Sequence, residues 1–233
     1  WLFAKGRGFY GKNGDIERAV GVLLDVTDRR RTESLREGQR AILELIARNA
    51  PLTETLTQLC RVVEAQGDGI LSSILILNGN RLRHAAGPSL PSEFNAEDVR
   101  WEDFREIALR HGLRACWSTP IRNREGKVMG TFAVYSRTPR PPSARERDLI
   151  ETGTYLGGIA MERYRNEQSL RDSEERFRLV AEATNDILWD WDLTTNDHWW
   201  SPNACERFAY DPRTEPSIEA WISRLHHDDK ERI

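Results

Sequence analysis

The sequence predicts an α+β protein whose antiparallel sheets are joined by long helices. Three turn signals, at residues 11–14, 78–80 and 123–126, each separate two apolar stretches of strand-like composition. The first two contain Asn-Gly pairs, which favour tight β-hairpins. Between the hairpins lie stretches whose apolar residues recur at helical spacing. Because hairpins join antiparallel strands directly, this order favours antiparallel sheets over parallel βαβ units.

The composition excludes several classes of protein. The chain has 233 residues, of which 39% are hydrophobic and 30% charged, with a net charge of −3. Such a chain can bury a core, and its nearly balanced charge gives no general attraction to nucleic acid or to anionic membranes. No apolar stretch is long enough to insert across a bilayer. The three cysteines lie far apart, so neither a disulfide framework nor a zinc site is indicated. We therefore expect a cytoplasmic segment.

The first hairpin runs directly into a charged helix. Its second strand ends in "DVTDRR", where Asp25 and Thr27 precede a run of three arginines. On the residues alone this is a strand, a capped turn and a solvated helix. The hairpin and this ending also resemble the last strands and exit motif of a PAS domain. The resemblance implies that Asp25 and Thr27 couple the sheet to an output helix.

Two helices carry apolar residues at seven-residue spacing, which is typical of a helical dimer seam. One covers about residues 28–48. The other runs over about 150–180, continuing a helix for which Ser143 and Glu146 form a capping-box pattern. We expect a parallel homodimer through these helices. The seam residues are Leu35, Ile42 and Asn49 on the first helix and Leu149, Leu156, Leu170 and Phe177 on the second.

The central part of the chain resembles a bacterial GAF domain over residues 41–165. The resemblance rests on "SILIL", "LRHAAGPSLP", "WEDFREIALRHGLRACWSTPI", "GKVMGTFAVY" and "PPSARERDLIE". Relatives have a longer segment, with a glycine-rich turn, a helix and an edge strand, where this chain has only residues 97–100. Either one wall of the GAF pocket is lost, or this sequence omits those residues, and the strand-like "EDVR" favours omission.

The GAF resemblance implies a cavity for a small-molecule ligand. We place its candidate residues at His84, Cys116, Trp117 and Phe132. His84 shares a strand face with Leu82 and could hold an anionic group or haem iron. Without a second ligand in the sequence, a satisfied core or rim histidine is the better interpretation. Haem is therefore not expected. Related bilin-binding domains attach the pigment to a cysteine in a helix, whereas Cys116 falls in a strand, so no bilin is expected either.

The remaining candidate sites also argue against cofactors and catalysis. Cys205 lies in "NACERF", which departs from the flavin-binding LOV motif, so no flavin is expected. The run of His226, His227, Asp228 and Asp229 could suggest a metal site, but it fits better as a turn whose aspartate caps a helix, so no metal is predicted. We therefore predict that this segment is not an enzyme. Two alternatives stay open, namely a thiol-dependent GAF enzyme using Cys116 and His84, and a ligand-free dimerisation scaffold.

The predicted organisation is a relay between sensory domains. Residues 1–33 are the C-terminal strands and exit motif of a PAS domain, and 34–48 a helical linker. Residues 41–165 are the GAF domain, and 150–180 a long connecting helix. Residues 173–233, with "ILWDWDL" and "HWWS", resemble the opening of a second PAS domain. The resemblance implies a sensory and relay segment of a bacterial signalling protein. Its output domain, in the same polypeptide, would be a histidine kinase or a protein of cyclic-di-GMP turnover.

Overall fold

The computed structural model divides the chain into two units, Trp1–Arg165 and Asn166–Ile233. No helix within the described residues is both long and apolar enough to cross a membrane. Gly11, Asn80, residues 97–100 and Cys205, which enter the sequence predictions, are not among the described residues. The described residues are 1–10, 12–67, 69–79, 81–95, 101–183, 187–192, 194–195, 197–201, 204, 222–223 and 225–230.

The first unit opens with an antiparallel hairpin, as predicted. Strands β1 (Leu2–Tyr10) and β2 (Ile16–Asp25) pair from Leu2 opposite Asp25 towards the turn. Gly14 in that turn has a φ of +83°, which a residue without a side chain adopts at little cost. Large apolar side chains stay exposed on both faces of the ribbon, Val22 on one and Leu23 on the other.

A four-stranded antiparallel sheet forms the centre of the unit. Its strands are β3 (Leu71–Asn78), β4 (Arg81–Ala86), β5 (Ala115–Arg122) and β6 (Val128–Ser136), in the order β4-β3-β6-β5. Every pair is antiparallel, which confirms the predicted sheet type. Strands β4 and β5 are therefore the edges, and β3 and β6 lie between them.

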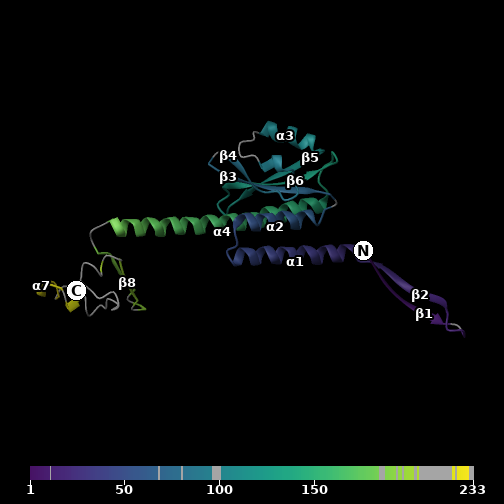
Figure 1. The fold of residues 1–233 in the computed structure, drawn as a ribbon, viewed down its shortest axis with the longest axis horizontal. Coiled ribbons are helices and arrows are strands. Elements are labelled where there is room, and N and C mark those ends of the chain that lie inside the picture. Colours follow the sequence, from purple (N-terminus) through teal and green to yellow (C-terminus); the bar gives the residue numbers. More distant parts are fainter. Residues whose placement is uncertain are drawn as a thin grey trace. The chain divides into compact units, whose positions relative to one another are not determined.

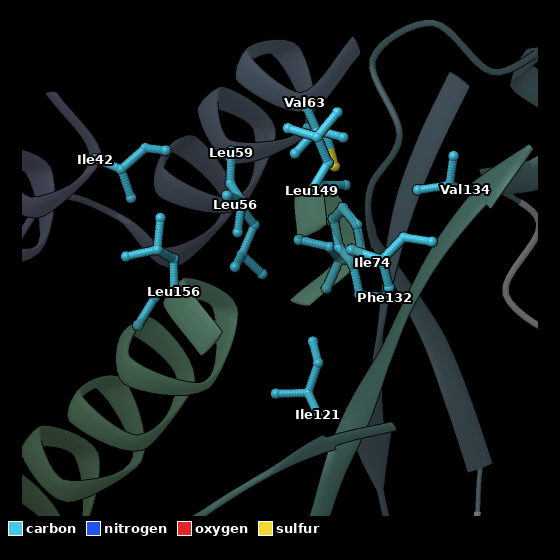
Figure 2. Packing of buried hydrophobic residues seen from close by; sticks show 14 of the residues in the cluster. Ile42, Leu56, Leu59, Val63, Ile74, Ile121, Phe132, Val134, Leu149 and Leu156 are labelled. Carbon is cyan, nitrogen blue, oxygen red and sulfur yellow. The ribbon is translucent and has the colours of Figure 1, made fainter. Parts of the chain in front are cut away.

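Helices cover both faces of this sheet (Figure 1). On one face lie α1 (Thr27–Ala47), α2 (Leu52–Glu64) and the first part of α4 (Ala144–Ala183). On the other lie the short helix η1 (Ser92–Asn95) and α3 (Trp101–Arg110). Since side chains alternate along a strand, each face has its own apolar cluster. The larger one, between the sheet and the three helices, includes Ile42, Leu56, Ile74, Phe132 and Leu149 (Figure 2).

Glycines let α4 lie directly on the sheet. A Cβ at Gly153 would stand 2.7 Å from the ring of Phe132, closer than side-chain atoms approach one another. A Cβ at Gly158 would stand 3.3 Å from the carbonyl oxygen of Arg122 on the edge strand. Because glycine has no side chain at these positions, the helix can pack closer to the strands than any other residue would allow.

The predicted dimer seam is wrong for its central members. Ile42 is 0% exposed, Leu149 2% and Leu156 5%, and all three belong to the cluster between the sheet and the helices. They are therefore buried within one chain and cannot pair with a second copy. The physical reason is that a seven-residue apolar repeat also marks the buried stripe of a helix lying on a sheet. Leu170 and Phe177, further along α4, are exposed.

The second unit contains a short antiparallel ribbon. Strand β7 (Trp189–Trp191) pairs with β8 (His198–Trp200), both within the stretches read as strands from the sequence. The ring of Trp199 lies 5.8 Å from that of Phe177. A helix of four residues, α7 (His227–Lys230), is described further on.

Leu156→Ala should destabilise the folded chain, because it leaves a cavity between α4 and the opposing helices. We expect the free energy of unfolding to fall by about 2–5 kcal/mol, measured by urea denaturation. The matched control is Leu170→Ala on the same helix, which should change this free energy by no more than about 0.5 kcal/mol. Equal effects of the two substitutions would contradict the assignment of Leu156 to the core.

Candidate functional site

A pocket of about 290 Å³ opens on the sheet face that carries α3. Tyr135, one of its lining residues, is buried, and its hydroxyl is hydrogen-bonded at 3.0 Å to that of Ser73 on the neighbouring strand. Arg114 lies at the rim and donates to the carbonyl oxygens of Leu109 and Leu113. The pocket is lined by Leu75, Phe94, Arg105, Ala108, Leu109, Leu113, Arg114, Ala115, Cys116 and Tyr135.

Cys116 lies in this pocket, directly opposite Tyr135 in the strand pair. It remains partly accessible because β5 is an edge strand. The thiol nevertheless lies against buried groups that exclude water, and this desolvation raises the pKa of Cys116 to about 11. Burial likewise raises the pKa of Tyr135 to about 12. Both groups are therefore protonated at neutral pH. Since the thiolate is the reactive form, Cys116 is a poor nucleophile in this setting.

His84 lies on the same sheet face, but on the opposite edge strand. It pairs with Leu75, and its Nε2 is buried without a hydrogen-bond partner among the described residues. Burial lowers the pKa of His84, which favours the neutral imidazole. Two strands separate β4 from β5, so His84 and Cys116 stand about three strand spacings apart, or ~14 Å. This geometry does not form a Cys–His catalytic pair, which requires hydrogen-bond contact.

Trp117 and Phe132 point to the other face. Trp117 packs at the border of the cluster under the helices, with the guanidinium of Arg140 at 5.4 Å from its ring centre. Phe132 is completely buried in that cluster beneath Gly153. The four predicted pocket residues are thus divided between two faces of one sheet. Adjacent residues of a strand point to opposite faces, so Cys116 and Trp117 cannot line the same pocket. The residue that lies beside Cys116 on its own face is Tyr135, its partner in the strand pair.

An ion pair fixes the start of α4 beside Trp117. Arg140 donates to both carboxylate oxygens of Glu146, at 2.7 and 2.6 Å. Glu146 also accepts from the backbone nitrogen of Ser143, whose hydroxyl accepts from the nitrogen of Glu146 in return. The predicted capping box is therefore confirmed. The Arg140 guanidinium is the main reason why the pKa of Glu146 falls to about 2.

The junction between the hairpin and α1 is held by local hydrogen bonds. The backbone nitrogen of Thr27 donates to Asp25 Oδ1 at 2.9 Å, and the hydroxyl of Thr27 accepts from the nitrogen of Trp1. Hydrogen bonding by the side chain of Thr27, and then by its backbone nitrogen, lowers the pKa of Asp25. Val26 in turn donates to the carbonyl oxygen of Trp1. The end of β2, the beginning of β1 and the first turn of α1 therefore meet at one point.

His226, His227 and Asp228 lie together at the start of α7. Each offers a ligand atom, and these atoms lie within 4.8 Å of one another. All three side chains are exposed, and each histidine pairs with the Asp228 carboxylate. Adjacent exposed groups of this kind commonly occur without a metal. The expected absence of metal, bilin, flavin and haem remains a prediction.

The family of the chain follows from the sheet, its helical cover and the match to known sequences. The GAF domain family model matches residues 19–162, from within β2 to the middle of α4. The chain belongs to the GAF domain family. The match includes the four-stranded sheet, the pocket on its α3 face and the helices on its other face.

A curated relative matches most of the chain. The methyl sulfide methyltransferase-associated sensor of Methanosarcina acetivorans is 34% identical over 210 residues, a match that covers 76% of this chain and 21% of that protein. The chain thus spans about a fifth of the length of this relative.

Two solved structures are similar at low identity. One is a domain of a two-component sensor histidine kinase protein from Sinorhizobium meliloti 1021, with 19% identity, a TM-score of 0.45, and coverage of 51% of this chain and 95% of that one. The other is a phycoerythrobilin-bound GAF domain of a cyanobacterial phytochrome, with 14% identity, a TM-score of 0.44, and coverage of 57% and 97%. At these values neither structure identifies a ligand of this chain.

Glu146→Gln should lower stability in a pH-dependent way. The pKa of Glu146 is lowered on folding, so the charged group stabilises the fold above its unfolded pKa of 4.5. This contribution is lost as the pH falls towards about 2. Urea midpoints of wild type and variant should therefore differ at pH 7 and converge at low pH. Glu125→Gln, in the exposed β5–β6 turn, is the control, and a difference independent of pH would contradict the ion-pair explanation.

Proposed function

We propose that this chain is a sensory and relay segment of a multidomain signalling protein, in which the GAF domain connects an input helix, α1, to an output helix, α4. The observation that carries the proposal is a bridge made by Gln66. Its amide nitrogen donates to Ser34 Oγ of α1 at 3.3 Å, and its amide oxygen accepts from Arg145 of α4 at 3.1 Å. Gln66 is only 5% exposed, so little water competes for these bonds.

A second contact ties the C-terminal end of α1 to the middle of α4. Arg163 of α4 donates to the carbonyl oxygen of Ala47 and to the side chain of Asn49, directly after α1. The two ties follow the same order along both helices, so α1 and α4 run parallel (Figure 1). A displacement that enters through α1 would therefore reach α4 at two separate points. Parallel, doubly tied helices are a suitable arrangement for a two-state relay.

The flanking segments would be parts of PAS domains, as the sequence resemblance implies. In support, the β1–β2 ribbon exposes apolar side chains on both faces, and an isolated two-stranded hairpin is marginally stable in water. We propose that Asp25 and Thr27 couple this ribbon to α1, because Asp25 at the end of β2 accepts a hydrogen bond from Thr27, the first residue of α1, and Val26 between them donates to the carbonyl oxygen of Trp1 beside β1. Residues 173–233 would open the second PAS domain, with β7 and β8 as its first strands.

The pocket on the α3 face would bind a small molecule. Its lining is mainly apolar, with Cys116 and Tyr135 as polar members and, among the described residues, Arg105 and Arg114 as charged members. This lining favours an apolar molecule with an acidic group. Cys116 would contact the ligand and His84 would stand at the far edge of the same face, whereas Trp117 and Phe132 would act through the helix packing.

The output domain would lie in the same polypeptide, as a histidine kinase or a protein of cyclic-di-GMP turnover, with the chain acting as a parallel homodimer. A relay fits better than a thiol-dependent enzyme, because Cys116 is protonated at neutral pH and distant from His84. It also fits better than a scaffold with no ligand, because polar and charged side chains line an otherwise apolar pocket. The relative from Methanosarcina acetivorans is itself named a sensor.

Gln66→Leu in the full-length protein tests the relay. The substitution keeps the size of the side chain but removes both hydrogen bonds, leaving Arg145 without this partner. We expect faster amide hydrogen exchange in the first turns of α4 and an output that no longer responds to the stimulus. Gln58→Leu is the control, because Gln58 lines a depression formed by α1, α2 and their connection only. Normal regulation in Gln66→Leu, despite altered exchange, would contradict the proposed route.

A further inference from the structure

A second hollow lies on the opposite side of the domain from the pocket, between α4 and the edge strand β5. This groove has a volume of about 830 Å³ and is open to solvent. Gly158, where α4 approaches β5 closely, is one of its lining residues. Its apolar lining comes from Trp117 and Pro120 of the strand and from Ile150 and Ile159 of the helix.

Tyr155 projects from α4 at the side of this groove. Tyr155 is 69% exposed, compared with 42% for Tyr164 further along the same helix. A protruding aromatic side chain and an apolar hollow thus share one surface. That combination is what a two-fold contact between identical chains requires, because the knob of each copy must find its hole on the same patch of the other.

The charges along the groove support the same kind of partner. Glu151 and Glu162 lie on α4 to either side of Tyr155, and Arg122, Arg124 and Arg147 lie around them. Glu162 already pairs with Arg124 at 3.5 Å across the groove. A surface that carries both signs side by side is complementary to itself, whereas nucleic acid or an anionic membrane would need one sign only.

The edge strand itself is a poor template for another strand. Pro120 lies in the middle of β5 and has no backbone N–H, so a partner strand could not continue the ladder there. Side-chain contact is therefore the mode of docking that the groove permits.

We propose that this groove is the contact between two copies of the chain, with Tyr155 of each copy seated against Trp117 and Ile159 of the other. The inference rests on the proposed homodimer and replaces the seam expected from heptad spacing, whose central residues are buried within one chain. A tyrosine side chain buries about 150–250 Å², and a stable contact buries about 800 Å² on each partner. Tyr155 would therefore be the centre of the contact, and the charged residues its rim.

The test is sedimentation equilibrium of the full chain, wild type against Tyr155→Glu. A charge at this position would be buried in an apolar groove, so we expect the dimer dissociation constant to rise at least about tenfold. Tyr164→Glu is the matched control, because Tyr164 is an exposed tyrosine on the same helix that does not line the groove. It should leave the dissociation constant within about twofold of wild type. Thermal unfolding monitored by circular dichroism should show both variants folded.

The outcomes separate this inference from the proposed function. A dimer whose dissociation constant is unchanged by Tyr155→Glu would overturn the groove contact and leave the homodimer in place. A wild-type chain that is monomeric at all accessible concentrations would overturn both the groove contact and the homodimer. Neither result would bear on the relay, which is tested separately through Gln66.

Discussion

The close contact of α4 with the central sheet determines the packing of the whole domain. The helix can lie on the strands because Gly153 leaves room for the ring of Phe132 and Gly158 leaves room for the backbone of β5. Contact over this length buries Leu149 and Leu156, and it brings Arg145 and Arg163 within reach of groups tied to α1. The same contact leaves Tyr155 on the outside. The core, the ties between α1 and α4, and the outer groove therefore share one geometric cause.

The sheet divides the domain into two chemical environments. On the helix face, apolar packing is combined with the buried polar bridge at Gln66, which can resist or transmit a shift between helices. On the α3 face, a smaller apolar cluster contributes Phe94, Leu113 and Tyr135 to the pocket. Ile74 and Phe132 on one face alternate with Leu75 and Ala133 on the other, in paired strands. A ligand that spreads these strands would therefore also disturb the packing under α4.

The hairpins and helices could largely be predicted from the sequence, because their signals are local. The turn at residues 123–126 and the capping box of Ser143 and Glu146 both lie where the sequence indicates them. The pocket could be predicted only in part, since it depends on which face each strand residue occupies. Cys116 and Trp117 are neighbours in the chain and lie on opposite faces. The dimer seam failed for a related reason: over two turns, a repeat of seven residues fits both a buried helical stripe and a coiled-coil seam.

We propose that α1 and α4 move as one connected pair within the GAF domain. The decisive measurement is the distance between spin labels on Arg40 of α1 and Asp148 of α4 in the full-length protein, obtained by pulsed electron paramagnetic resonance. Both side chains are exposed, so the labels should not disturb the core. We expect one narrow distance distribution that stays narrow when Asp25 is replaced by alanine. A broad distance distribution in the otherwise unmodified protein would contradict a connected pair of helices. Two separate label distances, unaffected by Asp25→Ala, would contradict it as well.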